Sequence, residues 1–297
     1  MAVQKTELKK FLDAKAKPTR LLGDIERYLL QRPPGDRSTV VLHPSEIIKR
    51  DWCKRASYFL LRGYDKVAEK PPLRLQSIFD TGHAIHSKWQ FWFQDMGILH
   101  GKFKCDVCDD ITWGTSPAEC EHCGAGKNKL VYAEVTLHDD TLRIKGHTDG
   151  WIKDEVGDAL IEIKSIGPGT IRAEAPDLMM DAGGDFMKAW TNIRRPFGPH
   201  ILQGQIYLEL MKRMGQVGSN GQPLDEIVFI YELKADQSFK EFKVKADYEL
   251  VRHVFEGAEK VVAAVEAGVA PRCNNNVGGT CKQCAPYSEE GFDTWEQ

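Results

Sequence analysis

The stretch Gly146–Ser165 is the sequence feature that most constrains the fold, because it places charged residues inside an apolar strand. The segment Thr141–Ile152 mixes β-branched and aromatic residues, as strands do. Asp154–Asp158 is rich in turn-forming residues, and Ala159–Ile163 is a short, mostly apolar run that suits a buried strand. Together these segments predict a β-hairpin whose second strand is buried.

Two charged residues, Glu162 and Lys164, stand in the predicted second strand. They are two residues apart, so their side chains point to the same face. Burying a charge is costly unless it is paired or binds a metal, and Asp149 across the turn supplies a second carboxylate. Two interpretations follow from these residues: a site for a hard divalent cation with a lysine beside it, or a buried Glu–Lys ion pair.

The order of the motifs along the chain resembles that of the PD-(D/E)xK nuclease superfamily. Asp149 followed by Glu162-x-Lys164 is similar to the superfamily's signature. Gly82–His86 (GHAIH) resembles the Gly-x-x-x-His element of its RecB-like branch, and Gln203–Tyr207 (QGQIY) resembles that branch's Gln-x-x-x-Tyr element. Each motif alone is weak, and the resemblance is strong because the four occur in the family's order.

The resemblance implies a role for each of these residues. The implied ligands of a catalytic Mg or Mn ion are His86, Asp149, Glu162 and the backbone carbonyl of Ile163. Lys164 would position a water or stabilise developing negative charge, and Gln203 and Tyr207 would hold the DNA strand. Without the resemblance, His86 suits a core histidine, and Gln203 and Tyr207 suit ordinary positions of an amphipathic helix.

Composition limits the class of protein. The chain has 297 residues and is 42% hydrophobic, which suits a globular protein of one large domain or two small ones. Its net charge of −3 does not indicate a nucleic-acid binder, although basic clusters occur at Lys49–Arg55, Arg194–Arg195 and Lys212–Arg213. The first ten residues lack the apolar segment of a signal peptide, and no apolar run is long enough for a membrane helix. We therefore expect a soluble, cytoplasmic protein with no membrane partner.

The eight cysteines are expected to bind metals, because a reducing compartment disfavours disulfides. Four of them form two Cys-x-x-Cys knuckles, CDVC at 105–108 and CEHC at 120–123. Two knuckles bring four thiolates to one tetrahedral centre, as in a structural zinc ribbon. We expect zinc at Cys105, Cys108, Cys120 and Cys123, with a redox pair or another metal as the alternative.

The other four cysteines are Cys53, Cys273, Cys281 and Cys284. Three in the tail make an odd set that Cys53 would complete, although Cys53 alone also suits a small buried hydrophobe. The set resembles the iron–sulfur staple of the CRISPR-associated Cas-four-type exonucleases, except that the wide gap in the tail comes before the narrow one. The resemblance implies a 4Fe–4S cluster, and four thiolates also accept zinc.

The predicted fold is α/β, a restriction-endonuclease-like mixed central sheet flanked by helices, with a small zinc-ribbon insertion. The expected parts are an N-terminal helical arm (1–40), a helical part of the nuclease domain (41–100), the zinc ribbon (101–130), the nuclease core (131–270) and an iron–sulfur cysteine segment (271–297). The expected helices are one that opens at His43–Glu46 with Ser45 as its N-cap and ends near Gly63, and others at Leu73–Met96, Phe197–Met214 and Ala246–Ala267. The further expected strands are Lys129–Leu137, with Glu134 as a surface or edge carboxylate, Glu226–Lys234 and Phe239–Lys245.

The implied activity is metal-dependent hydrolysis of DNA phosphodiesters from an end of a single strand, in recombination, repair or DNA processing. The resemblance is to stand-alone enzymes of phages and prokaryotes, so a phage-encoded protein would act in the host cytoplasm. We also consider a recombination protein as a partner. Two other classes stay open: a catalytically silent DNA-binding adaptor in a recombination or spacer-acquisition complex, and an iron–sulfur redox protein whose hairpin carboxylates are structural.

Overall fold

A computed structural model describes residues 21–31, 40–64, 71–276 and 279–287. These belong to two compact units, one formed by Met1–Arg37 and Ala68–Asp80 and the other by Ser38–Val67 and Thr81–Gln297. In the first unit the described residues form helix α2 (Leu22–Gln31) and the beginning of helix α5 (Leu73–Asp95). The rest of the predicted N-terminal arm, up to residue 39, lies outside the described residues.

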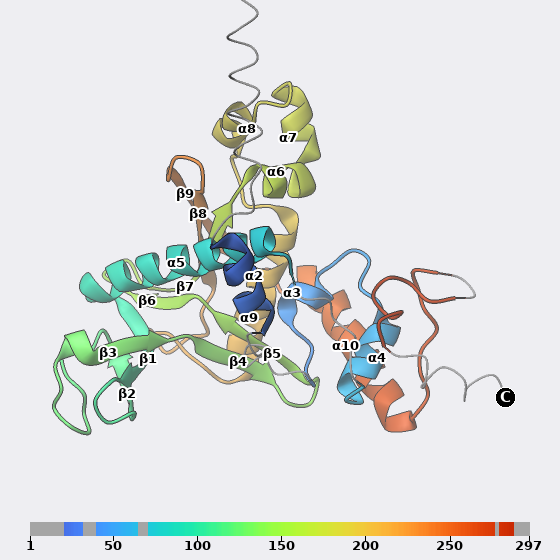
Figure 1. Cartoon of the computed structure of the whole chain (residues 1–297). Helices are drawn as coiled ribbons and strands as arrows, with labels where there is room; N and C mark the ends of the chain where they lie inside the picture. The colour runs from blue at the N-terminus through green and yellow to red at the C-terminus, as the bar shows by residue number, and fades with distance from the viewer. Residues whose placement is uncertain (1–20, 32–39, 65–70, 277–278, 288–297) are drawn as a thin grey trace, which may run out of the picture. The chain divides into compact units, whose positions relative to one another are not determined.

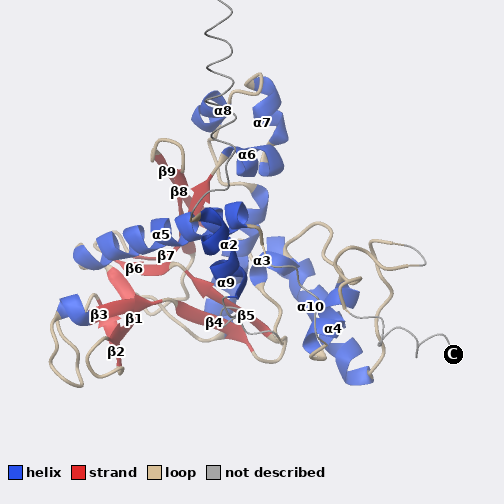
Figure 2. Ribbon diagram, viewed as in Figure 1, coloured by secondary structure: helices blue, strands red, loops and turns tan. Residues whose placement is uncertain are grey.

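The second unit is built around a seven-stranded sheet (Figures 1 and 2). Its strands lie in the order β2 (Ile111–Thr115), β1 (Leu99–Cys105), β6 (Gly150–Lys153), β7 (Asp158–Ile166), β8 (Glu226–Leu233) and β9 (Phe239–Lys245), and β3 (Leu130–Ala133) pairs with β1. β7 and β8 run parallel, and the other neighbours run antiparallel. Strands β4 (Val135–Asp139) and β5 (Ile144–Thr148) form a separate antiparallel hairpin. The predicted mixed α/β fold is confirmed.

Helices cover both faces of the central sheet (Figure 2). Alternate residues of β7 point to opposite faces. Ile161 and Ile163 share a buried cluster with Ile85 of α5, whereas Leu160 shares one with Ile206 of α9 (Gly198–Arg213). The two helices therefore cover opposite faces. The remaining helices are α3 (Pro44–Ile47), α4 (Lys54–Leu61), α6 (Pro168–Glu174), α7 (Pro176–Asp181), α8 (Phe186–Asn192), α9 (Gly198–Arg213), α10 (Glu249–Ala267) and the short 3-10 turn Lys127–Lys129.

The chain ahead of α5 forms two short helices, α3 and α4, rather than the single one predicted. The N-cap of α3 is His43 and not Ser45, because Pro44 occupies the first helical position, where a helix needs no N–H donor. The break after α3 places Cys53 immediately before α4, in a buried cluster that also contains the C-terminal cysteines. Cys53 therefore lies at the start of a helix and not within one.

Two strands predicted as continuous are each divided by an acidic residue. The predicted strand Lys129–Leu137 is β3 and β4, with Glu134 between them. The predicted first strand of the central hairpin is β5 and β6, with Asp149 between them. The chain passes from one sheet to the other at both acids. A continuous strand would place Val131 and Val135 on one face, but Val131 is exposed while Val135 is buried.

The other predicted elements are confirmed with small shifts at their ends. α5, α9, α10, β8 and β9 occupy the predicted segments, and Gly268 ends α10 in the left-handed region with a φ of 69°. The predicted zinc ribbon is continuous with the central sheet, because β1 pairs with β6 as well as with β2 and β3. Across the described residues, no helix has the length and apolar character needed to span a membrane.

Candidate metal centre

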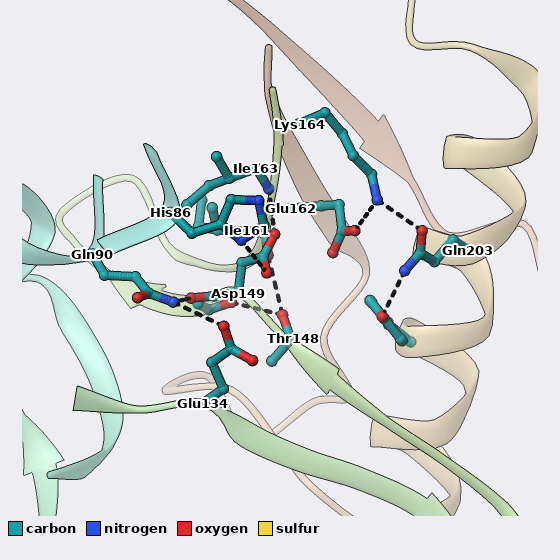
Figure 3. Close-up of polar contacts among 12 residues, drawn as sticks. His86, Gln90, Glu134, Thr148, Asp149, Ile161, Glu162, Ile163, Lys164 and Gln203 are labelled. Carbon is teal, nitrogen blue, oxygen red and sulfur yellow. Dashed lines mark hydrogen bonds and ion pairs between the residues drawn. The ribbon is translucent and has the colours of Figure 1, made fainter. Parts of the chain in front are cut away.

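The candidate site is built on the edge of β7 that β6 leaves free (Figure 3). The pairing of β6 with β7 ends at Gly150 and Ile161. Beyond that point side chains, and not a neighbouring strand, hydrogen-bond to the backbone of β7. Thr148 Oγ1 donates to the Ile161 carbonyl at 3.1 Å, and Asp149 Oδ2 accepts from the Ile163 N–H at 2.6 Å. Both backbone groups of a strand residue face the same edge, so the Ile163 carbonyl faces the edge at which Asp149 lies.

His86, Glu134 and Asp149 form a compact acidic group with one imidazole (Figure 3). Each offers one ligand atom, and these atoms lie within 4.8 Å of one another. His86 Nδ1 is 3.1 Å from Asp149 Oδ1. Gln90, one turn after His86 on α5, donates to Glu134 Oε1 at 3.2 Å and to the Asp149 carbonyl at 2.9 Å. Three separate segments of the chain thus meet at one point.

Glu162 and Lys164 stand beside this group, on the face of β7 that α9 covers (Figure 3). Lys164 Nζ is 2.6 Å from Glu162 Oε1 and donates to Gln203 Oε1 at 2.8 Å. Gln203 Nε2 in turn donates to the Tyr207 hydroxyl at 2.7 Å. Glu162 is 2% exposed, and within the described part of the chain its Oε2 has no hydrogen-bond partner. A buried anionic oxygen of this kind is costly unless a cation satisfies it.

Burial and crowding shift the pKa values of the acids and of their neighbours. Burial raises the pKa of Glu162 to about 7, against the lowering effect of Lys164 and with a further rise from Asp149. Burial, followed by the charge of Asp149, also raises the pKa of Glu134. Burial lowers the pKa of His86, but the hydrogen bond and charge of Asp149 outweigh it and raise the pKa. Carboxylates that repel one another in this way are stabilised by a divalent cation.

Two glycines bring the helices close enough to the sheet to place these side chains. A Cβ at Gly204 would lie 2.8 Å from Phe229 Cζ, so a larger residue would push α9 away from β8 and displace Gln203 with it. A Cβ at Gly82 would lie 3.3 Å from Ser165 Oγ, close to the end of β7. Glycine inside a helix costs about 1 kcal/mol relative to alanine, and these contacts explain its presence in α5 and α9.

Glu134 and Gln90 are two further residues of the site that the sequence motifs did not indicate. Glu134 was expected at the surface or an edge, yet it is half-buried and belongs to the compact group. Its signal was its position as the one charged residue in the run Leu130–Leu137. The signal for Gln90 was its spacing of four residues from His86, which places both on one face of a helix.

Both sets of four cysteines come together in the structure. The sulfur atoms lie within 4.8 Å of one another in the set Cys105, Cys108, Cys120 and Cys123, and again in the set Cys53, Cys273, Cys281 and Cys284. All eight are free thiols, and separations of 3.7 Å for Cys105–Cys123 and 3.9 Å for Cys53–Cys273 are far longer than a disulfide bond. Each set has the donors that zinc or an iron–sulfur cluster takes.

The chain matches no protein-family model and no curated protein. Among solved structures it is similar to an alkaline exonuclease, LHK-Exo from Laribacter hongkongensis, with 12% identity and a TM-score of 0.40 over 77% of this chain and 90% of that chain. The complex of LHK-Exo with dAMP gives 12% identity and a TM-score of 0.39 over the same shares. The structure of SSO0001 gives 11% identity and a TM-score of 0.35 over 82% of this chain and 84% of that chain. Likenesses this distant assign no activity, so the function of this chain rests on its own residues.

Proposed function

We propose that this chain is a DNA nuclease that hydrolyses phosphodiesters with the help of a divalent metal ion. The observation that carries the proposal is the partnerless, buried Oε2 of Glu162 beside the group formed by His86, Glu134 and Asp149. An ion pair with Lys164 uses the other oxygen of Glu162 and leaves this one unsatisfied, so the pair alone does not account for the carboxylate. The order of the motifs, which resembles that of RecB-like nucleases, supports the same proposal.

The donor set fits a hard divalent cation such as Mg or Mn, which favours carboxylate and carbonyl oxygens. The proposed ligands are His86, Asp149, Glu162, the Ile163 carbonyl and, in addition to those expected from the sequence, Glu134. When bound, the cation would supply Lewis-acid chemistry, polarising a phosphodiester and lowering the pKa of a water.

Lys164 supplies a fixed positive charge beside the carboxylates. Glu162 and Gln203 hold its Nζ at 2.6 and 2.8 Å. Burial lowers the pKa of Lys164, but the charges of Glu162 and Asp149 outweigh it and raise the pKa, which keeps the ammonium group protonated. A protonated lysine here would orient a water or stabilise the negative charge that develops on a phosphate.

Gln203 and Tyr207 are proposed to act on the DNA strand through Lys164. Both side chains are buried, at 8% and 5% exposure, and each takes part in the chain of hydrogen bonds that ends at the lysine. The sequence predicts that Gln203 and Tyr207 hold the DNA strand directly. We propose instead that they position Lys164, which would face the DNA.

Tyr207→Phe is expected to lower kcat roughly tenfold while KM for DNA and the melting temperature change little. Phenylalanine keeps the packing of the ring but removes the hydroxyl that accepts from Gln203, which frees the amide to rotate away from Lys164. Steady-state kinetics and a melting curve measure both effects. A rise in KM at constant kcat would instead show direct contact with DNA, and a lower melting temperature with normal kinetics would show a core residue only.

The finer assignments are proposals as well. We propose single-stranded DNA with a free end as the substrate, zinc at Cys105, Cys108, Cys120 and Cys123, and a 4Fe–4S cluster at Cys53, Cys273, Cys281 and Cys284. The resemblance of the motifs and of the cysteine order supports these assignments, as it does a recombination protein as a partner. Both metal groups would be structural, because neither set of thiolates includes a residue of the candidate metal centre.

The direct test is an assay with end-labelled single and double strands, each linear and circular, in Mg, Mn or EDTA. We expect linear single strands to be degraded with Mg or Mn and all substrates to stay intact in EDTA. Intact circles beside degraded linear strands would show that a free end is required. DNA binding without cleavage in Mn would refute the nuclease and leave the adaptor.

A further inference from the structure

We propose that the open face of the β4–β5 hairpin binds the sugar–phosphate backbone of a single nucleic-acid strand that reaches the metal centre. This proposal rests on the proposed function, because the face begins at the same site. It names a surface that extends away from the metal ligands and the kind of partner that the surface fits.

The hairpin leads directly away from the metal centre. Val135 and Thr148 form the last pair of its register at that end. Glu134 and Asp149 are the next residues along the two strands, and both belong to the compact group of ligand atoms. A strand of nucleic acid lying along the hairpin would therefore run straight into the site.

The two faces of the hairpin differ sharply in burial. Its inner face consists of Val135, Leu137, Ile144, Gly146 and Thr148, which are all buried. Its open face, here called the β4–β5 face, consists of Thr136, His138, Lys145 and His147, which are partly or fully exposed. The four side chains of this face are polar or basic, which favours a polar or charged partner.

A cavity of about 440 Å³ lies on the β4–β5 face. Its lining includes Thr136, His138 and Lys145 from the face, together with Arg143 and Asp140 from the turn that joins the two strands. The turn is at the end of the hairpin opposite to the metal centre. A strand held at both places would therefore follow the whole length of the hairpin.

The charge of the cavity favours a polyanion. Lys145 and Arg143 carry full positive charges, and no acidic side chain among the described residues forms an ion pair with either. Asp140 is the one acid of the lining, and its carboxylate is 3.0 Å from Nδ1 of His138. Because the whole chain has a net charge of −3, this positive potential is a local feature and not a consequence of composition.

The dimensions suit one strand. Lys145 is four residues before Asp149, a distance of about 13 Å at the rise of a β-strand. A stacked single strand rises about 3.4 Å per nucleotide along its axis, so roughly four nucleotides cover this distance. Leu42 pairs with Ile144 and so borders β5 on its outer side. Neighbouring strand axes are about 5 Å apart, which makes the open face narrow and suits one backbone rather than a duplex. A single nucleic-acid strand that is shorter than this and bound at the metal centre should not contact Lys145.

The test compares Lys145→Glu with Lys243→Glu, which makes the same change of charge at an exposed position of the outer strand β9. In EDTA, Lys145→Glu is expected to weaken the binding of a fluorescein-labelled twelve-nucleotide single strand about tenfold. The slope of log affinity against log salt should fall by about 0.7. Lys243→Glu should bind as the unmodified protein does. Lys145→Arg, which keeps the positive charge, should do the same. Fluorescence anisotropy at several salt concentrations measures affinity, and melting curves confirm that the variants are folded.

Cleavage separates this proposal from the proposed function. With Mg, Lys145→Glu is expected to lower kcat/KM for the long strand about tenfold and to leave kcat/KM for a trinucleotide unchanged. Binding that depends on Lys145 without any cleavage would retain the β4–β5 face and refute the nuclease. Equal binding and cleavage of both lengths by Lys145→Glu and the unmodified protein would overturn the β4–β5 face and leave the nuclease intact. If the unmodified protein does not bind the strand in EDTA, the β4–β5 face is also overturned.

Discussion

Glu162→Gln is expected to give a folded protein whose rate of DNA cleavage is reduced by roughly 10³-fold or more. Glutamine has the shape of glutamate and still offers an oxygen to Lys164, but it removes the negative charge that a divalent cation requires. Asp149→Asn should have the same effect, and its side-chain oxygen can still accept from the Ile163 N–H. These two variants therefore separate the loss of a metal ligand from the loss of a hydrogen bond that supports the strand edge.

The effects of these changes should not add. A double variant of Glu162 and Asp149 is expected to be no slower than either single variant, because each single loss already removes the same ion. Lys164→Met should also inactivate the enzyme, yet Mn should still raise its melting temperature, since the lysine acts on a water or a phosphate and not on the ion. Cleavage rates and melting curves with and without Mn measure both properties on the same samples.

A purely structural ion pair predicts the opposite pattern. If Glu162 and Lys164 are only partners, as their separation of 2.6 Å allows, each single change leaves one buried charge alone. The free energy of unfolding would then fall by about 3–5 kcal/mol, and cleavage would persist. A folded, inactive Glu162→Gln that has lost its stabilisation by Mn supports the metal centre. An unstable variant that still cuts DNA refutes it.

Cys284→Ala is expected to bleach protein that is brown when purified without oxygen, and to lower its melting temperature steeply. The four thiolates connect residues more than two hundred positions apart, since Cys53 precedes α4 while Cys284 lies in the tail. Their cluster also packs with Tyr58, Phe59 and Tyr287, so losing the metal group would loosen a small core. The free energy of metal binding becomes free energy of folding in such sites.

Cys108→Ala is the matched control for this prediction, because it removes one thiolate from the other set. It should release about one zinc per chain and leave iron, sulfide and colour in place, whereas Cys284→Ala should do the reverse. Structural zinc contributes about 10–16 kcal/mol in small peptides, so each variant should show a clear loss of stability. Metal analysis and melting curves decide. Colourless protein with two zinc ions per chain would overturn the iron–sulfur assignment and spare the nuclease.

The sequence by itself determined the elements whose patterns are local. The helical period of α5, α9 and α10, and the strand runs of β8 and β9, lie within about twenty residues each and predicted their segments correctly. Cys-x-x-Cys knuckles and the odd count of cysteines in the tail likewise indicated two sets of four, and the sulfur atoms meet in those sets. The metals, the ligand roles of His86, Asp149 and Glu162, and the polarity of cleavage stay predictions.

Only the tertiary structure decided where the strands divide and which acids meet. A period of two along Lys129–Leu137 cannot show that the chain changes sheets at Glu134, because the two halves of the segment pair with different strands, β1 on one side and β5 on the other. The same holds at Asp149, where the end of the β6–β7 pairing leaves the Ile163 N–H for a carboxylate. Such tertiary contacts determine whether a buried charge is stabilised. The free energy of a carboxylate depends on all the groups that surround it in space, and not only on its neighbours in the chain.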